Sequence, residues 1–125
     1  MRKIEDGISI KEKVLNSKKA VIVGGGYIGI ELLEAFVRQN LHVVLLEYNK
    51  FIMKHFDEDM SELILNQLVE SSHGRFEIYT SENVIELIGD INGVKKVKTD
   101  SGNYFDADLV IIASGVKPNS EIASD

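Results

Sequence analysis

Three glycines, Gly24, Gly26 and Gly29, stand at the spacing G-x-G-x-x-G directly after a short apolar run, residues 20–23. In such a pattern the first glycine permits a tight turn, the second lets the backbone approach a pyrophosphate, and the third lets a helix pack close to a sheet. The helix that follows would present free N–H groups and the positive end of its dipole, which suit a diphosphate. The glycines therefore predict a dinucleotide-binding turn between a strand and a helix.

The glycine spacing is weak evidence by itself, because glycine-rich turns also arise for purely conformational reasons. A dinucleotide site further requires a second strand and an acidic residue about 20 residues beyond the glycines. Residues 41–46 form an apolar run that predicts a buried parallel strand, and Glu47 follows it directly. In this context the Glu47 carboxylate would accept hydrogen bonds from the adenosine ribose hydroxyls. The alternative is a glutamate at the end of a strand that only faces water.

The same segment predicts NADH in preference to NADPH. The Glu47 carboxylate would repel a 2′-phosphate, and Tyr48 and Asn49 supply no adjacent cation. Lys50 is the one nearby positive charge in this stretch of the sequence.

The composition is typical of one globular domain that is large enough to bury a core. The chain has 125 residues, of which 44% are hydrophobic and 27% are charged. Cysteine is absent, which excludes disulfides, thiolate nucleophiles and thiolate metal sites from this chain. The three histidines, His42, His55 and His73, show neither helical pairing nor an acidic cluster, so we expect no metal site.

Charge and hydropathy limit the partners. The net charge of −6 argues against a nucleic acid, because phosphate binding depends on clustered lysine and arginine. No apolar run approaches the roughly 18 residues of a membrane span, and the first residues lack a signal-peptide core. We therefore expect a cytoplasmic location, with no membrane partner.

The elements that would position these residues alternate between helix and strand over the first part of the chain. The patterns predict helices at 8–15, 27–38 and about 57–74, and strands at 19–23, 41–46 and 76–79.

A different pattern begins after residue 80. Residues 83–88, 94–99 and 103–105 are short runs separated by turn sequences, which is typical of an antiparallel meander. The apolar run 108–113 predicts a strand that is buried on both faces and returns to the parallel sheet beside the first strand. The sequence thus predicts an α/β, Rossmann-like three-layer domain, in which a parallel sheet carries an inserted three-stranded antiparallel β-meander. No linker interrupts residues 1–125, so we expect one domain.

Three segments, in this order, resemble the NAD-binding domain of the pyridine nucleotide–disulfide oxidoreductase family. They are GGGYIGIE at residues 24–31, FDEDM at 56–60 and ASGVKPN at 113–119. Within that family the chain is most similar to the branch of NADH oxidases, NADH peroxidases and coenzyme A–disulfide reductases. The resemblance covers nearly the whole chain and implies an NAD(H)-binding domain.

The resemblance carries roles over to the matching positions. It implies that Gly24, Gly26 and Gly29 approach the pyrophosphate and that Glu47 holds the ribose. Ile28 belongs to the same motif and is included among the cofactor-binding residues.

Further roles follow from the resemblance alone. Tyr27 would cover the flavin ring until the nicotinamide displaces it, and Glu31 would lie near nicotinamide and flavin. The loop of Gly115, with Pro118 and Asn119, would lie along the nicotinamide side. Each role has a structural alternative: Tyr27 could simply cover the first helical turn, Glu31 could stabilise the helix start through the dipole, and the turn at Gly115 could only set the chain direction.

Enzymes of this family also carry a separate FAD-binding domain, a redox-active cysteine and a dimerisation domain, and this chain contains none of them. The resemblance therefore implies the middle part of a longer, homodimeric enzyme that binds NADH here and FAD on another domain. No catalytic residue is expected in the chain itself. Two alternatives stay open: a regulatory NAD(H)-binding module without catalysis, and the nucleotide domain of a nitrite or rubredoxin reductase. An exposed apolar face around Tyr27 and Gly115 would favour docking of an FAD domain over a self-contained module.

Overall fold

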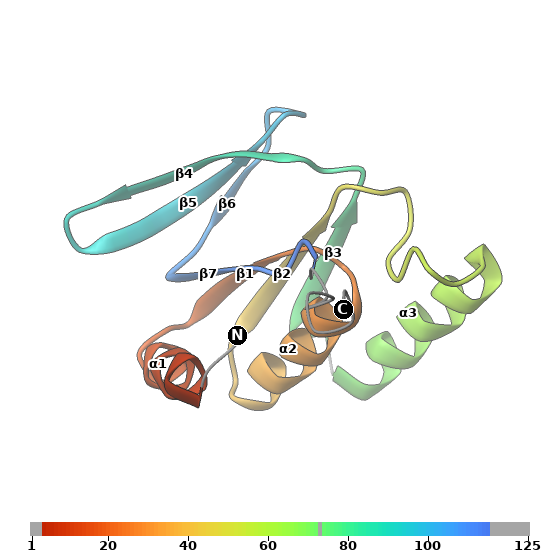
Figure 1. Ribbon diagram of the computed structural model, residues 1–125, viewed down its shortest axis with the longest axis horizontal. Coiled ribbons are helices and arrows are strands. Elements are labelled where there is room, and N and C mark those ends of the chain that lie inside the picture. Colours follow the sequence, from red (N-terminus) through yellow and green to blue (C-terminus); the bar gives the residue numbers. More distant parts are fainter. Residues whose placement is uncertain (1–3, 73, 116–125) are drawn as a thin grey trace, which may run out of the picture.

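The computed structural model describes residues 4–72 and 74–115, and the segments 1–3, 73 and 116–125 lie outside the described part. The described residues form three layers: helices, a parallel sheet and an antiparallel sheet (Figure 1). The helices are α1 (Ile4–Leu15), α2 (Tyr27–Arg38) and α3 (Glu58–Ser72). The strands are β1 (Lys19–Val23), β2 (His42–Glu47), β3 (Phe76–Thr80), β4 (Val84–Asp90), β5 (Gly93–Thr99), β6 (Tyr104–Asp106) and β7 (Leu109–Ile112).

The parallel sheet has the strand order β3-β2-β1-β7, and the antiparallel sheet has the order β4-β5-β6. Strand β1 is central, because Val21 pairs with Val44 of β2 on one side and with Val110 of β7 on the other. The chain leaves β1 towards β2 and β3 and returns to the opposite side of β1 only after the meander. The carboxyl end of β1 is therefore the point where the strand order reverses, which is where ligands bind in open α/β sheets.

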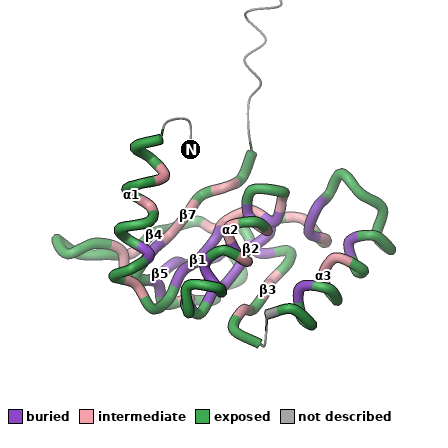
Figure 2. Tube along the Cα trace, turned by 90° about the horizontal axis from the view of Figure 1, so that it is seen from below, coloured by how far each residue is buried: buried purple, intermediate pink, exposed green. Residues whose placement is uncertain are grey.

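Two apolar cores lie on the two faces of the parallel sheet, because successive side chains of a strand point to opposite faces. One core packs the sheet against the helices and includes Ile22, Leu33, Val43 and Leu45. The other packs the sheet against the meander and includes Val21, Val44, Leu46, Val97 and Ala107. Burial is concentrated along β1 and β2, which are covered on both faces (Figure 2).

The predicted fold class is confirmed: the parallel sheet, the helices and the inserted three-stranded meander are all present, and β7 pairs with β1. The third layer is the meander itself, so all three helices pack on one face. Helix α1 begins at Ile4, earlier than the sequence pattern indicated. The expectation that residues 108–113 are buried on both faces is wrong at their carboxyl end. Strand β7 is one of the two edge strands of the sheet, and Ile112 is 64% exposed.

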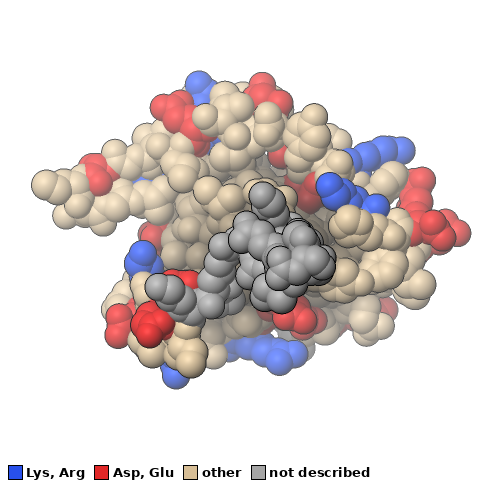
Figure 3. All heavy atoms as spheres, in the orientation of Figure 1, with Lys and Arg blue, Asp and Glu red and all other residues tan. Residues whose placement is uncertain are grey.

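The surface and the helices bear on possible partners. On the face shown in Figure 3, basic and acidic side chains occur in small separate groups, with no broad positive area. No helix within the described segments has the length and apolar character required to cross a lipid bilayer.

Candidate functional site

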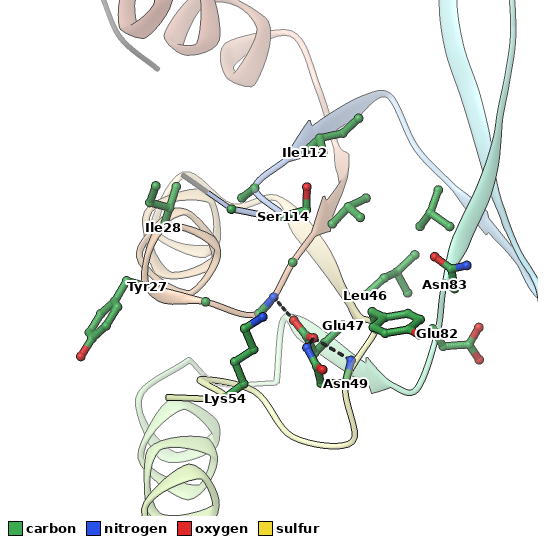
Figure 4. A pocket seen from close by; sticks show the side chains of 18 of the residues that line it. Tyr27, Ile28, Leu46, Glu47, Asn49, Lys54, Glu82, Asn83, Ile112 and Ser114 are labelled. Atoms are coloured by element: carbon green, nitrogen blue, oxygen red, sulfur yellow. Dashed lines mark hydrogen bonds between the residues drawn. The ribbon is translucent and has the colours of Figure 1, made fainter. Parts of the chain in front are cut away.

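A cleft of about 760 Å³ opens at the carboxyl ends of β1, β2 and β7 (Figure 4). Its walls are the glycine turn (residues 24–26), the first turn of α2, the loop after β2, the start of β4 and residues 112–115. Of the residues predicted from the sequence, those that line the cleft are Gly24, Gly26, Tyr27, Ile28, Glu47 and Gly115. The structure thus brings most of the predicted site residues to one place.

Two glycines of the motif are required by the packing of the chain itself. Gly24 has a φ of +112°, and a Cβ there would lie 2.5 Å from the carbonyl oxygen of Ala113. The Gly24 N–H donates to the Leu46 carbonyl at 2.8 Å, so the turn is also tied to β2. A Cβ on Gly29 would lie 1.9 Å from the Gly24 carbonyl oxygen, and α2 would have to move away from the turn. Both residues allow the close strand-to-helix turn that the spacing predicted.

Gly26 is different, because none of the described residues requires a glycine there. It is the N-cap of α2 with φ −82° and ψ −172°, which is an ordinary extended conformation. A Cβ at Gly26 would meet no atom of residues 4–72 and 74–115 within 4 Å, apart from its own chain neighbours. Among the described residues no side chain caps α2, and its first turn contains no acidic residue. The space in front of the helix's free N–H groups is therefore open, and these residues fit the pyrophosphate of a dinucleotide.

Glu47 is buried, with 7% of its surface exposed, and its side chain faces the glycine turn (Figure 4). One carboxylate oxygen, Oε2, accepts a hydrogen bond from the Gly25 N–H at 2.6 Å. The other, Oε1, accepts from the backbone N–H of Asn49 at 2.7 Å and from its Nδ2 at 2.5 Å. A carboxylate has about four acceptor positions, so about one is left for a ligand. The alternative of a glutamate that only faces water is wrong.

Tyr27 and Ile28 lie on the first turn of α2, with 58% and 44% of their surfaces exposed. The Tyr27 ring contacts Phe56 edge-on, with ring centres 5.9 Å apart and an interplanar angle of 72°. Phe56 belongs to the second of the three motif segments, so the fold brings two of these segments into contact.

The remaining predicted residues are less central to the cleft. Glu31 is exposed on α2, one turn beyond Tyr27, and does not line the cleft. Gly115 lines the cleft beyond the end of β7, whereas Glu47 ends β2, and these two strands lie on opposite sides of β1. Pro118 and Asn119 lie outside the described residues.

Several residues of the cleft were not anticipated from the sequence: Asn49, Lys54, His55, Glu82 and Asn83. Asn49 had a usable signal, because an asparagine two residues after a strand-ending glutamate is typical of a turn. Lys54 had no such signal, because the loop between β2 and α3 shows no hydrophobic periodicity that would predict its conformation. Within the described segments, no group of three or more histidine, aspartate or glutamate side chains could hold a metal ion.

Glu82 forms a polar network on the meander side of the cleft. Its carboxylate accepts hydrogen bonds from the Ser101 hydroxyl at 2.6 Å and from Asn103 Nδ2 at 2.8 Å. Its backbone N–H donates to the Glu47 carbonyl at 3.0 Å. The hydrogen bond from Ser101, followed by that from Thr99, lowers the pKa of Glu82. Glu82 therefore anchors the turn between β5 and β6 to the loop that follows β3.

We expect Glu82→Gln to destabilise the protein in a pH-dependent way. The folded pKa lies below the unfolded value, so the contribution of the carboxylate is complete above about pH 4.3 and is lost as the pH falls through the folded pKa. Urea unfolding at pH 7 should show a loss of about 1–2 kcal/mol, and the gap to wild type should narrow at pH 3. An exposed strand residue, Glu86, supplies the control variant Glu86→Gln. A gap of equal size at both pH values would contradict this role of Glu82.

The layers and the strand order define a Rossmann-like domain of the kind found in oxidoreductases. The chain belongs to the pyridine nucleotide-disulphide oxidoreductase family, whose sequence model matches residues 1–125. The resemblance inferred from the three motif segments is thereby confirmed.

The relatives are oxidoreductases. The chain is 38% identical over 118 residues to an NADH oxidase of Enterococcus faecalis, which covers 93% of this chain and 26% of the oxidase. It is 39% identical over 121 residues to a CoA-dependent NAD(P)H sulfur oxidoreductase of Pyrococcus abyssi, which covers 94% of this chain and 26% of that enzyme. Among solved structures, a water-forming NADH oxidase from Lactobacillus brevis, bound to NADH, superposes with a TM-score of 0.82 at 25% identity, covering 97% of this chain and 26% of the oxidase. The chain thus spans about a quarter of the length of each.

Proposed function

We propose that the chain is the NADH-binding domain of an FAD-dependent oxidoreductase and positions NADH for hydride transfer to a flavin on another domain. The observation that carries this proposal is the open space at Gly26, in front of uncapped N–H groups and beside a buried carboxylate. The family, and the relatives named as NADH oxidases, support it.

The cleft offers a place for each part of the dinucleotide. The pyrophosphate would lie at the backbone N–H groups that begin α2, next to Gly26. The adenosine ribose would lie at Glu47, which leaves the adenine between Tyr48 and the start of β4. The nicotinamide would lie at the other end, near Gly115. When bound, NADH supplies the hydride, and the residues of this chain supply binding and orientation.

Exposed apolar side chains around the mouth of the cleft support a second domain as the partner. Tyr27, Ile28, Phe56 and Ile112 are each at least 40% exposed, although they lie beside the candidate site. Exposed apolar side chains grouped beside a cleft are typical of an interaction surface. A regulatory module without catalysis would instead bury this face in a symmetric dimer. Sedimentation of the wild-type chain and of Ile112→Glu separates the two, because only the dimer would dissociate.

The proposed function is tested by calorimetric titration of the 125-residue chain with NADH and, separately, with FAD. We expect NADH to bind with a Kd between about 10 μM and 1 mM, because a flavin domain would supply the rest of the nicotinamide pocket. FAD, which shares only the ADP half with NADH, should bind more weakly than NADH. ADP-ribose, which lacks the nicotinamide, should bind nearly as well as NADH. No binding of NADH at several millimolar, or tighter binding of FAD, would refute the proposal.

A further inference from the structure

The cleft contains a cation that the binding scheme above does not use. Lys54 lines the cleft, and its side chain points toward the glycine turn and the Glu47 carboxylate (Figure 4). Within residues 4–72 and 74–115, Lys54 has no hydrogen bond or ion pair. Lys50, the cation noted in the sequence, lies instead over the Phe51 ring at 4.7 Å from its centre and does not line the cleft.

The two carboxylates that line the cleft are both held by donors of the protein. Glu47 accepts three hydrogen bonds, from Gly25 and Asn49. Glu82 accepts hydrogen bonds from Ser101 and Asn103, on the meander side. These donors offset part of the negative potential that would oppose a second phosphate. The Lys54 ammonium, in contrast, has no protein acceptor among the described residues and is available to an anionic ligand.

We propose that Lys54 allows the cleft to accept the 2′-phosphate of NADPH as well as the 2′-hydroxyl of NADH. This inference rests on the proposed function, because the ribose must lie at Glu47 for its 2′-substituent to come near Lys54. The charge of Glu47 still favours NADH, and the positive charge of Lys54 opposes that preference. The cleft is thus selective for NADH only to a moderate degree, unlike the prediction from Glu47 and its sequence neighbours.

The test compares the Kd of NADH and NADPH for the 125-residue chain, for Lys54→Met and for the control Lys50→Met. We expect the wild-type chain to bind NADPH within about tenfold of NADH. Lys54→Met should raise the Kd of NADPH about tenfold or more, as loss of a charge-assisted hydrogen bond predicts, and change that of NADH less than about threefold. Lys50→Met should leave the ratio of the two values unchanged. For the wild-type chain, raising the salt concentration should increase the Kd of NADPH more than the Kd of NADH.

The possible outcomes separate this inference from the function on which it rests. If NADH binds and NADPH is more than a hundredfold weaker, the inference is wrong and the proposed function stands. The inference is also wrong, and the proposed function stands, if Lys54→Met raises the Kd of both nucleotides equally. Lys54 would then contact a part of the molecule that NADH and NADPH share. If neither nucleotide binds, the proposed function itself fails. Thermal unfolding of each variant confirms that an observed loss comes from the cleft.

Discussion

Gly26→Asp is expected to stabilise the fold and to abolish NADH binding. Gly26 is the N-cap of α2, and aspartate is a favoured N-cap residue whose charge also complements the helix dipole, so the free energy of unfolding should rise by about 0.5–1 kcal/mol. A carboxylate there would also fill the open space and face the pyrophosphate. Repulsion between like charges at such a contact costs several kcal/mol, so the Kd for NADH should rise at least about a hundredfold. Urea unfolding and calorimetry measure the two effects separately.

Two control variants show whether the charge of Gly26→Asp causes the loss of NADH binding. Gly26→Asn has the same shape and also caps a helix, but carries no charge, so it should weaken NADH binding less than Gly26→Asp does. Gly24→Ala should instead destabilise the protein by about 1–3 kcal/mol, because its Cβ would overlap the Ala113 carbonyl at a positive φ. If Gly26→Asp binds NADH as the wild type does, the pyrophosphate does not lie at α2.

Glu47→Ala is expected to reduce both stability and NADH affinity. The substitution leaves the buried N–H of Gly25 without its acceptor, which should cost about 1–3 kcal/mol of unfolding free energy. Loss of the ribose hydrogen bonds should weaken NADH by about 1–3 kcal/mol, which is roughly 5- to 150-fold. Chemical unfolding of the free protein measures the first effect, and titration at a temperature where the variant is folded measures the second.

Asn49→Ala is the matched control for the structural part of this role. It removes the side-chain donor to Oε1 but leaves the backbone N–H of Asn49 and the Gly25 bond in place. We therefore expect a smaller loss of stability than for Glu47→Ala, and little change in the NADH affinity. Glu47→Ala with unchanged NADH affinity would assign Glu47 a structural role alone.

The sequence predicted the central part of the fold closely, because local patterns determine it. The bounds of β1 and α2 agree with the prediction, since an apolar run, the glycines and a helical period follow one another without interruption. Asn40 follows the C-cap residue Gln39 and, with a φ of 66°, does not continue the helix. The exposure of Ile112 could not be predicted in this way, because an apolar run reads the same in an edge strand as in a central strand.

The candidate site was predicted in part for a similar reason. The glycine spacing and Glu47 can be recognised from the sequence. The three hydrogen bonds that Glu47 accepts cannot, because they depend on how the loop folds. Lys54 comes from an irregular segment, so only the three-dimensional structure brings it to the cleft. The roles carried over for Tyr27, Glu31 and Gly115 stay predictions until a nucleotide is bound.

The cleft lies along the seam between the two apolar cores, where the helices cover one face of β1 and the meander covers the other. A molecule bound across that seam would be held by groups from both halves of the fold, so neither half could open without releasing it. A nucleotide bound in the cleft would thus couple the opening motions of α2 to those of β4. These two elements are far apart along the chain. When the nucleotide is bound, the amide protons of both should exchange more slowly with solvent.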